Sequence, residues 1–599
     1  MKTPMSRLIP TTALLFLLMA SCSTSSSGPE NQTDTLADVT ADTAEDGTVE
    51  ADQSQGEDGA SKEIADEDIA EVRDNPALLF PHNPVKDEWI PQEVSLSNID
   101  DEAGGMTGPY ANVFNCLNED GGWTRDYDIP MLGPVHVQLC NIKKTVFPDD
   151  AGSYEHVTVP TDLLDPSDSF AEMMLFYHMN FIHDYYKQVH GFSGMDFPLE
   201  GYVNLQGYLE MENPLDGIPE GWVTFDNAMF IPKESLEMIE ELGAELLAQY
   251  LGVDDKLDLP FKNDAILFLQ GEALDFAYDA DVIYHEYTHA VVGGDRLFGY
   301  GIDEFGPDAA PTSINEAYAD YFSCSVMGDP VVSEYALETL GAGRDVSQMF
   351  HCPTDYFGES HQDGQIYSSA LWAIREALGQ EDSDLIIFNA LLTFQNDTCF
   401  QEAAMATIAE AALLDPPKDT EVEAIFEERG ILGCNGRVKP YADKTEGFPD
   451  IVPGTQTLGV DVFAEAAPGF TQYQFEVEEG TQSLVIEVQA ETGLGIPFLE
   501  DFLGPMPVEL SAAFSPDGPI QFIYEPEFSH NALGVLPFEE VEDGILRLTV
   551  AGSCLTPGTW YFQFWNRSAS DATIRQIVMT QSTQPATEAN FNCDEEPPE

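Results

Sequence analysis

The chain has 599 residues, so at roughly 150 residues per domain it has room for about four domains and a large core. Its 107 acidic and 23 basic side chains give a net charge of −84, which repels phosphate backbones and anionic lipid headgroups, so we expect no nucleic-acid partner. Hydrophobic residues make up 43% of the chain, which is a globular composition, and we expect an acidic monomer of several domains.

The N-terminus has the features of an export signal. Lys2 and Arg7 precede the apolar run 13–20, which is too short to span a bilayer. Cys22 follows Met19-Ala20-Ser21, and this pattern resembles the bacterial lipobox. The resemblance implies cleavage after residues 1–21, a lipid on Cys22 as the single membrane attachment, and a place on the bacterial outer membrane or cell surface, or release outside the cell. The alternative is an ordinary cleavage site followed by an unrelated cysteine.

Residues 22–76 are rich in Ser, Thr, Ala and acids. Between 23 and 75, 16 acids face only Lys62 and Arg73, which predicts an extended, self-repelling tether. Eight cysteines remain besides Cys22, an even number that predicts disulfides in an exported protein. Pairing between sequence neighbours would close short loops, but the sequence leaves the connectivity open.

The folded part of the chain changes its pattern twice. Short β-rich runs at 135–139 and 156–159 predict a small β unit over 77–164. Helical spacing then predicts a mostly helical core over 165–438, with helices at 170–186, 234–251, 279–292, 312–327, 368–378 and 402–413. Alternation at period two predicts a β-sandwich over 439–585, with strands at 472–477, 483–488, 546–550 and 560–565, before an acidic tail at 586–599. The predicted fold class is α+β.

The predicted helix at 279–292 contains His285-Glu286-Tyr287-Thr288-His289, an H-E-x-x-H pattern. Residues i and i+4 lie one above the other on a helix, so the two imidazoles can take two corners of a zinc tetrahedron, with Glu286 beside the metal. Composition alone predicts roughly 0.02 chance occurrences of this pattern. The alternative, two His on an exposed helix face, disagrees with the apolar residues around them, which predict a buried helix.

A catalytic zinc needs a third protein ligand, and the next predicted helix offers Asn315-Glu316-Ala317-x-x-Asp320. The two motifs together resemble thermolysin-like and fungalysin-like zinc metallopeptidases, and the resemblance covers roughly residues 165–440. It implies a zincin core, with a β-rich N-terminal lobe and a helical C-terminal lobe. It also implies that Glu316 is the third zinc ligand and that Asp320, with Asn315, supports the ligand histidines. A capping box with Ser313 is the other interpretation of Glu316.

Looser matches to the same family lie outside the two helices. Asn227 and Ala228 stand in a segment similar to the strand that holds the substrate backbone. Arg344 resembles a substrate-binding arginine, and His361 resembles a histidine that stabilises the oxyanion. Tyr300 is the available tyrosine in the long segment between the ligand helices, and we assign it no role.

These features predict a secreted or surface-anchored zinc endopeptidase that acts on polypeptides, with Glu286 as general base on a zinc-bound water. The C-terminal segment resembles the pre-peptidase C-terminal type of sandwich, with a role in secretion, adhesion or autoprocessing. The competing hypothesis is a non-catalytic, zinc-stabilised surface lipoprotein that acts as an adhesin. Acidic runs at 254–255 and 279–281 could hold Ca²⁺, although charge runs are usually solvated faces.

Overall fold

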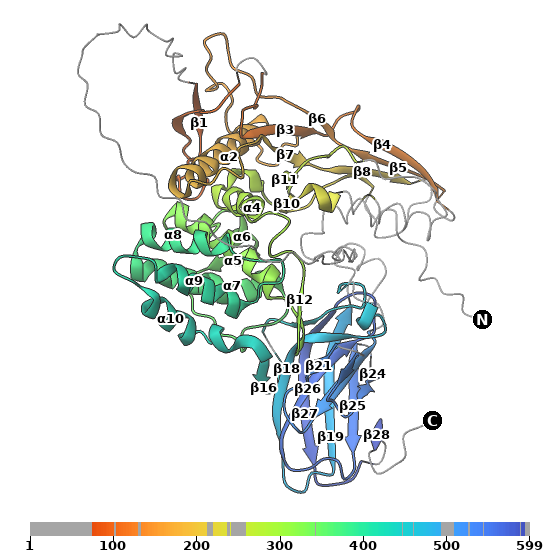
Figure 1. The fold of residues 1–599 in the computed structure, drawn as a ribbon. Helices are drawn as coiled ribbons and strands as arrows, with labels where there is room; N and C mark the ends of the chain where they lie inside the picture. The colour runs from red at the N-terminus through yellow and green to blue at the C-terminus, as the bar shows by residue number, and fades with distance from the viewer. Residues whose placement is uncertain are drawn as a thin grey trace, which may run out of the picture. The chain divides into compact units, whose positions relative to one another are not determined.

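The computed structural model describes residues 75–592, except 101–103, 130–132, 212–219, 237–239, 241–258, 342, 446, 459–460, 493–507, 525–527, 543 and 587–588 (Figure 1). The predicted signal, Cys22, the tether, most of the helix predicted at 234–251, the acids at 254–255 and most of the acidic tail lie outside these residues. The described chain is α+β, with a β-rich N-terminal region, a helical centre and C-terminal sheets, as predicted.

The N-terminal region contains two main sheets. The first has the order β10-β11-β7-β3-β6, with parallel pairs β11–β7 and β7–β3. Its strands are β3 (Ala111–Leu117), β6 (Asn141–Lys143), β7 (Leu199–Leu205), β10 (Ala228–Ile231) and β11 (Ala265–Leu269). The second, β4-β5-β8-β9, is built from β4 (Thr124–Ile129), β5 (Gly133–Leu139), β8 (Gly207–Met211) and β9 (Gly221–Val223). The predicted boundary between the small β unit and the helical core is at residue 164, and the first sheet contains strands from both of these predicted regions.

The structure confirms one of the two strands predicted in the small β unit and not the other. The strand predicted at 135–139 is confirmed as part of β5. The run 156–159 forms no strand, because a turn closes at Val157 and Pro160 ends the segment before it can pair. A separate hairpin, β1 (Pro76–Leu79) with β2 (Gln92–Ser95), precedes both sheets.

The helical centre begins with α2 (Ser169–His190), where Asp168 accepts the N–H groups of Phe170 and Ala171 and Gly191 ends the helix at φ 66°. The helices predicted at 279–292, 312–327, 368–378 and 402–413 are present, the third with an earlier start. They are α4 (Ala280–Val292), α5 (Ala310–Met327), α7 (Ser360–Leu378) and α9 (Phe400–Ala411). The sequence patterns missed α6 (Ala336–Leu340), α8 (Gln380–Leu391) and α10 (Asp419–Glu428).

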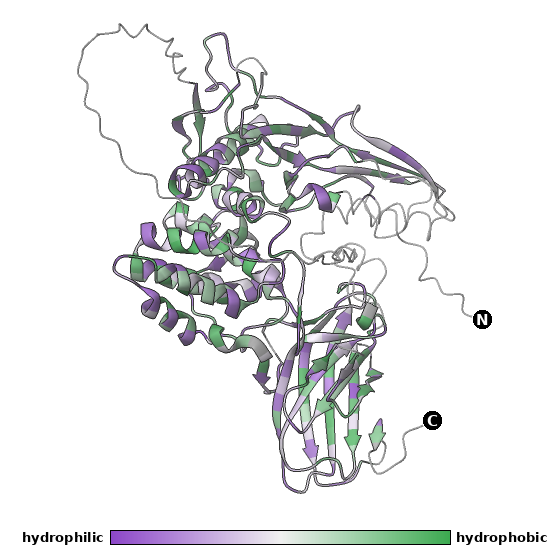
Figure 2. Ribbon diagram, viewed as in Figure 1, coloured by the Kyte–Doolittle hydropathy of each residue, from purple (hydrophilic) through white to green (hydrophobic). Residues whose placement is uncertain are grey.

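The C-terminal region is a pair of sheets with hydrophobic and hydrophilic residues interleaved along their strands (Figure 2). One sheet has the order β16-β18-β26-β20-β23 and the other β17-β27-β19-β25-β24. The four predicted strands fall within β18 (Ala467–Val477), β19 (Ser483–Thr492), β25 (Ile545–Ala551) and β26 (Gly558–Asn566). The others are β16 (Val438–Pro440), β17 (Asp450–Val452), β20 (Leu510–Ser515), β23 (Val535–Pro537), β24 (Glu539–Glu542) and β27 (Ala572–Ser582). Inward residues of both sheets share one apolar core, as alternation requires.

The cysteines depart from full pairing. Cys116–Cys140 and Cys352–Cys434 are disulfides, whereas Cys324 and Cys399 are free thiols. The prediction of disulfides is confirmed, although Cys324 stays unpaired as a small buried side chain inside α5. Among the described helices, none combines the length and the apolar character that a bilayer crossing requires.

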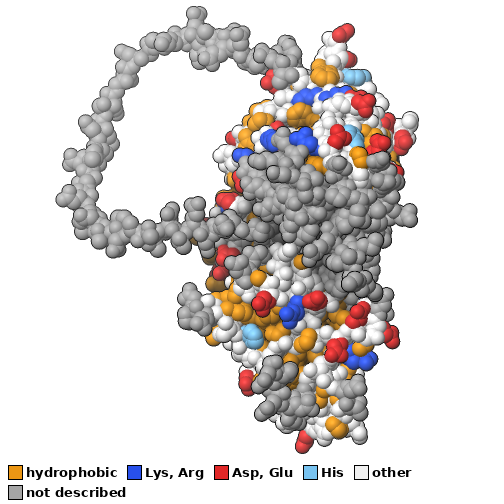
Figure 3. Space-filling model, turned by 90° about the vertical axis from the view of Figure 1, so that its right-hand side faces the viewer, with side chains coloured by type: hydrophobic (Ala, Val, Ile, Leu, Met, Phe, Trp, Pro, Cys, Tyr) orange, Lys and Arg blue, Asp and Glu red, His pale blue; other side chains and the backbone are white. Residues whose placement is uncertain are grey.

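Acidic side chains occupy several separate places on the face drawn in Figure 3. Asp and Glu side chains are scattered over the coloured part of the face drawn in Figure 3 rather than gathered in one patch. The described fold carries this charge around well-formed apolar cores, as the composition predicted.

Candidate metal centre

Helix α4 places two imidazoles on one face. It starts after Asp279, whose side chain accepts the N–H of Asp281, and it ends at Gly293 with φ 83°. His285 and His289, four residues apart, project from the same side toward α5, which packs against α4. His285 is 6% exposed, so a charge placed here is largely shielded from water.

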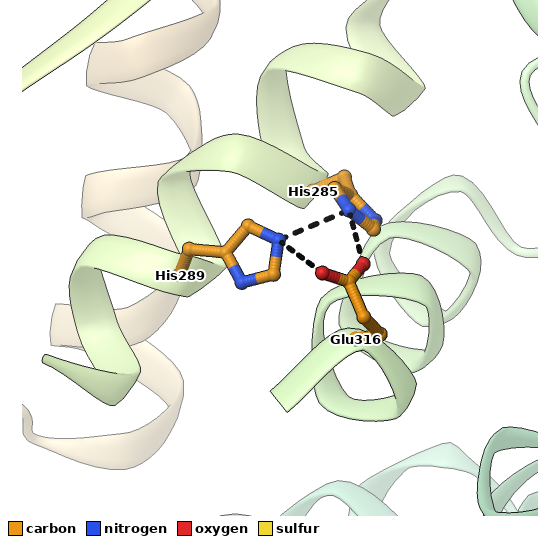
Figure 4. Close-up of side chains that lie close together, drawn as sticks. All are labelled: His285, His289 and Glu316. Atoms are coloured by element: carbon orange, nitrogen blue, oxygen red, sulfur yellow. Dashed lines mark hydrogen bonds and ion pairs between the residues drawn. The ribbon is translucent and has the colours of Figure 1, made fainter. Parts of the chain in front are cut away.

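Glu316 comes from α5 and completes the group (Figure 4). Its Oε2 lies 3.3 Å from His285 Nε2, and its Oε1 lies 3.8 Å from His289 Nε2. The two Nε2 atoms are 3.1 Å apart. Among the described residues, these three side chains form the one group of at least three His, Cys, Asp or Glu whose ligand atoms converge closely enough to hold a metal ion.

Glu316 has no capping role. The helix starts at Ala310, so Ser313 lies inside it, and its hydroxyl donates to the carbonyl of Ala309. The capping-box interpretation is therefore wrong. The carboxylate faces the two imidazoles instead, and its Oε2 is buried and accepts no hydrogen bond of normal geometry within the described chain.

The Nδ1 atom of each imidazole lies close to a side-chain oxygen of α5. His285 Nδ1 lies 2.9 Å from Asp320 Oδ1, and His289 Nδ1 lies 2.9 Å from Asn315 Oδ1. Each Nδ1 therefore carries the proton in the neutral ring, which leaves the Nε2 lone pairs pointing toward each other. Asn315 and Asp320 thus lie next to the imidazoles, where the family resemblance implied supporting groups.

This donor set fits zinc. Two nitrogens at about 2.05 Å from a tetrahedral centre are about 3.3 Å apart, close to the observed 3.1 Å. Two neutral Nε2 lone pairs at that distance repel each other unless a proton or a cation lies between them. A third, otherwise unbonded carboxylate oxygen then completes two His and one Glu, a ligand set of catalytic zinc sites.

Charges in the pocket favour ionised side chains. Burial lowers the pKa of His285, but the nearby carboxylates of Asp320 and Glu316 outweigh it and raise the pKa to about 10. Burial raises the pKa of Asp320, but Arg344 and His285 bring it to about 2. Burial likewise opposes ionisation of Glu316, yet His361 and the two ligand histidines hold its pKa well below the usual range.

Glu286 faces the β-rich region. Its Oε2 accepts the backbone N–H of Phe230 at 2.8 Å, and the residue is 7% exposed. Phe230 belongs to β10, an edge strand of its sheet among the described residues. Ala228 is the first residue of this strand, and Asn227 directly before it accepts the N–H of Leu269 in β11 through its backbone carbonyl. The predicted substrate-binding segment is thus beside Glu286.

His361 lies in the first turn of α7. Its Nε2 is 3.5 Å from Glu316 Oε2, and its Nδ1 is 2.9 Å from Glu359, the N-cap residue of the helix. Glu316 raises the pKa of His361 to about 9 despite burial. Gly364 lets the helices approach, because a Cβ there would lie 2.9 Å from the carbonyl oxygen of Ser313 in α5.

Arg344 and Tyr300 lie in different surroundings. Arg344 makes two hydrogen bonds to Asp320, at 2.9 and 2.6 Å, with 12% of its side chain exposed. Arg344 therefore contacts Asp320, which in turn contacts His285. Substrate binding by Arg344 stays a prediction. Tyr300 packs on Phe470, with ring centroids 5.0 Å apart.

The acids at 279–281 belong to no comparable metal group. Asp279 accepts the hydroxyl of Ser333 and the N–H of Ala336. Asp281 lies near Lys86, whose ammonium pairs with Asp329 and with Glu334. The surrounding carboxylates raise the pKa of Lys86, although burial opposes this. The charge partner of the acids at this corner is a lysine.

Sequence reasoning missed three parts of the site. The N–H of Phe230 is a backbone group and carries no side-chain signal. Glu359 stands two residues before His361, and an acid directly before a helix start was the available signal for a cap. Gly364 lies three residues after His361, but its packing role appears only when the partner helix is in place. Comparison with protein-family models and with curated proteins gives no match for this chain.

Proposed function

We propose that this protein is a zinc-dependent endopeptidase that hydrolyses peptide bonds in polypeptides. The observation that carries the proposal is that the Nε2 atoms of His285 and His289 lie 3.1 Å apart and face Glu316. The Nδ1 atom of each ring lies beside an oxygen acceptor, and Glu286 stands between the two histidines in the sequence. A purely structural zinc site has no use for an acid at that position, because structural sites are closed by four protein ligands.

His285, His289 and Glu316 would hold the ion, as the family resemblance also implies. Zinc bound there would lower the pKa of a coordinated water to about 7 and polarise a carbonyl. Glu286 takes the proton of the attacking water and returns it to the leaving amine, since its Oε2 is fixed by Phe230 N–H while Oε1 stays available. His361, whose Nε2 lies 3.5 Å from Glu316 Oε2, donates to the developing oxyanion.

The edge of β10 supplies a binding mode for the substrate. An extended peptide can add itself to such an edge through main-chain hydrogen bonds. Because β10 contains Phe230 and directly follows Asn227, a peptide docked along it passes beside Glu286. This mode favours unfolded or loop segments of protein substrates over regular helices.

The test replaces the general base and keeps the metal ligands. Glu286→Gln removes the proton acceptor, so casein cleavage should fall by at least about a thousandfold while the zinc content stays near one ion per chain. Glu423→Gln on the exposed side of α10 is the matched control and should keep full activity. Wild-type activity in Glu286→Gln would dispose of the mechanism.

The competing function is a zinc-stabilised surface lipoprotein without catalysis. It shares the zinc and the anchor at Cys22, but it predicts that the zinc-loaded wild type cleaves no protein or peptide library. Metabolic labelling with palmitate, compared between wild type and Cys22→Ser, tests the proposed attachment to the bacterial outer membrane or cell surface separately from the chemistry.

A further inference from the structure

The C-terminal sheets meet the helical centre at a buried arginine. Arg437 lies directly before β16, is 3% exposed and adopts the left-handed conformation at φ 44°. Its guanidinium makes two hydrogen bonds to Asp303, at 2.9 and 3.0 Å, and an ion pair to Asp308 at 3.1 Å. It also donates to the carbonyl of Phe470 in β18 at 3.0 Å. One side chain thus joins the sandwich to the segment 301–308.

That segment leads into the helix of the third ligand. It forms the hairpin β12 (Gly301–Asp303) and β13 (Gly306–Asp308) immediately before α5. Asp308 accepts the N–H of Ala310, the first residue of α5, and the hydroxyl of Tyr356. Asp308 therefore contacts both Arg437 and the first residue of α5. Through the charged groups of Arg437 and Asp308, the sandwich fixes the start of the helix that carries Glu316.

The hairpin makes two further contacts with the sandwich. The N–H of Phe522, in β21 (Phe522–Ile523), donates to the carbonyl of Glu304 at 2.7 Å. The ring of Phe522 lies against Gly306, where a Cβ would be 3.2 Å from it at a φ of 110°. Only glycine combines that conformation with such a close approach.

A separate set of contacts reaches the helix of His361. The N–H of Ile451, in β17, donates to the carbonyl of Phe357 at 2.8 Å. The ring of Phe470 lies over Gly358, where a Cβ would be 2.5 Å away. Phe357 and Gly358 in turn donate their N–H groups to Asp363 of α7, so the loop before His361 is held between the sandwich and its own helix.

We infer that the C-terminal sandwich is a positioning element of the metal centre, through Arg437 and Phe470, and not a separable appendage. It touches the lead-in segments of both α5 and α7, which carry Glu316 and His361. Ordering those segments favours convergence of the third ligand on the two histidines, so sandwich docking and zinc binding stabilise each other. The inference rests on the proposed function only in its activity readout.

The first experiment uses the whole wild-type chain. Thermodynamic linkage requires that if docking favours zinc binding, zinc must favour docking. Removing zinc with a chelator should therefore speed hydrogen exchange at the amides of Phe522 and Ile451 by about tenfold. The amides of Val485 and Leu548, in the sheet interior of the sandwich, serve as the internal reference and should not change. Equal exchange at Phe522 and Ile451 with and without zinc overturns the inference.

The second experiment weakens each contact separately. Arg437→Met and Phe470→Ala should each weaken zinc binding about tenfold in chelator competition and lower kcat more than they raise KM. Arg437→Lys should restore part of the affinity, because it keeps the charge without the planar fork. Arg547→Met removes an exposed ion pair with Glu487 within the sandwich and is the control.

The outcomes separate the two ideas. Unchanged zinc affinity in both Arg437→Met and Phe470→Ala rejects the positioning role. If Arg437→Met fails to fold, Phe470→Ala and the wild-type exchange comparison still decide. A wild type that shows zinc-linked exchange but no proteolysis rejects the endopeptidase function and supports the positioning role, because neither zinc affinity nor exchange requires turnover.

Discussion

Zinc binding to this site should depend steeply on pH above neutrality. In the metal-free protein, the carboxylates of Asp320 and Glu316 overcome burial and raise the pKa of His285 to about 10. A zinc ligand must be neutral, so binding has to expel that proton. The perturbation is therefore a change of pH between about 7.5 and 9, where free histidines with a pKa of about 6.5 are already neutral.

The size of the effect follows from the shifted pKa. With a pKa of about 10, roughly one His285 in 300 is neutral at pH 7.5 and roughly one in 11 at pH 9. Apparent zinc affinity should rise about 30-fold over this range, whereas an unshifted histidine gives a change of about 1.1-fold. The proton costs about 3.4 kcal/mol of zinc binding free energy at pH 7.5, from 2.5 pH units at 1.36 kcal/mol each.

Competition with a chelator of known pH-dependent affinity measures this directly. Calorimetry in two buffers of different ionisation enthalpy should show release of about one proton per zinc. Asp320→Asn removes the negative charge beside His285 Nδ1, so its affinity curve should rise less steeply above pH 7.5 than that of the wild type, while Glu423→Gln should follow the wild type. A wild-type curve that is flat from pH 7.5 to 9 would refute the reasoning.

Three further outcomes test the surrounding structure. His361→Ala should lower kcat about 100-fold or more with little change in KM, measured on a fluorogenic peptide. Gly364→Ala should cost about 1–3 kcal/mol of unfolding free energy by chemical denaturation, because its Cβ meets the backbone of α5, whereas Gly433→Ala, with open space around it, should not. Breaking Cys352–Cys434, whose cysteines are 82 positions apart in the sequence, should lower the free energy of unfolding by about 4.5 kcal/mol, and equal denaturation midpoints with and without reductant would contradict this.

The metal group was predictable because helix geometry is local. The spacing of His285 and His289 fixes their shared face, and Asp320 lies one turn beyond Glu316 on α5, so each helix specifies its own half of the site. The convergence of the halves came from family resemblance, since nothing in the spacing says which helix packs on α4. The supporting role of Asn315 followed in the same way.

Other parts depend on contacts between distant segments, which single-sequence patterns do not encode. The early start of α7 escaped prediction because its first two turns are polar and contain Gly364, while its cap is Glu359 instead of the more usual Ser, Thr, Asp or Asn. Helix α10 escaped because only Val422 and Phe426 are buried in it. Arg437 gave no signal, since its αL conformation and its partners emerge only when two regions meet.

Lys86, the lysine among the acids near the start of α4, affects how this part of the fold depends on divalent cations in the medium. Lys86 is tethered covalently, so its concentration beside Asp281, Asp329 and Glu334 does not vary with the medium. A sequestering agent that strips divalent ions should leave this corner intact, because a lysine and not an ion stands among its carboxylates. The corner should keep its charge balance equally in calcium-poor and calcium-rich media.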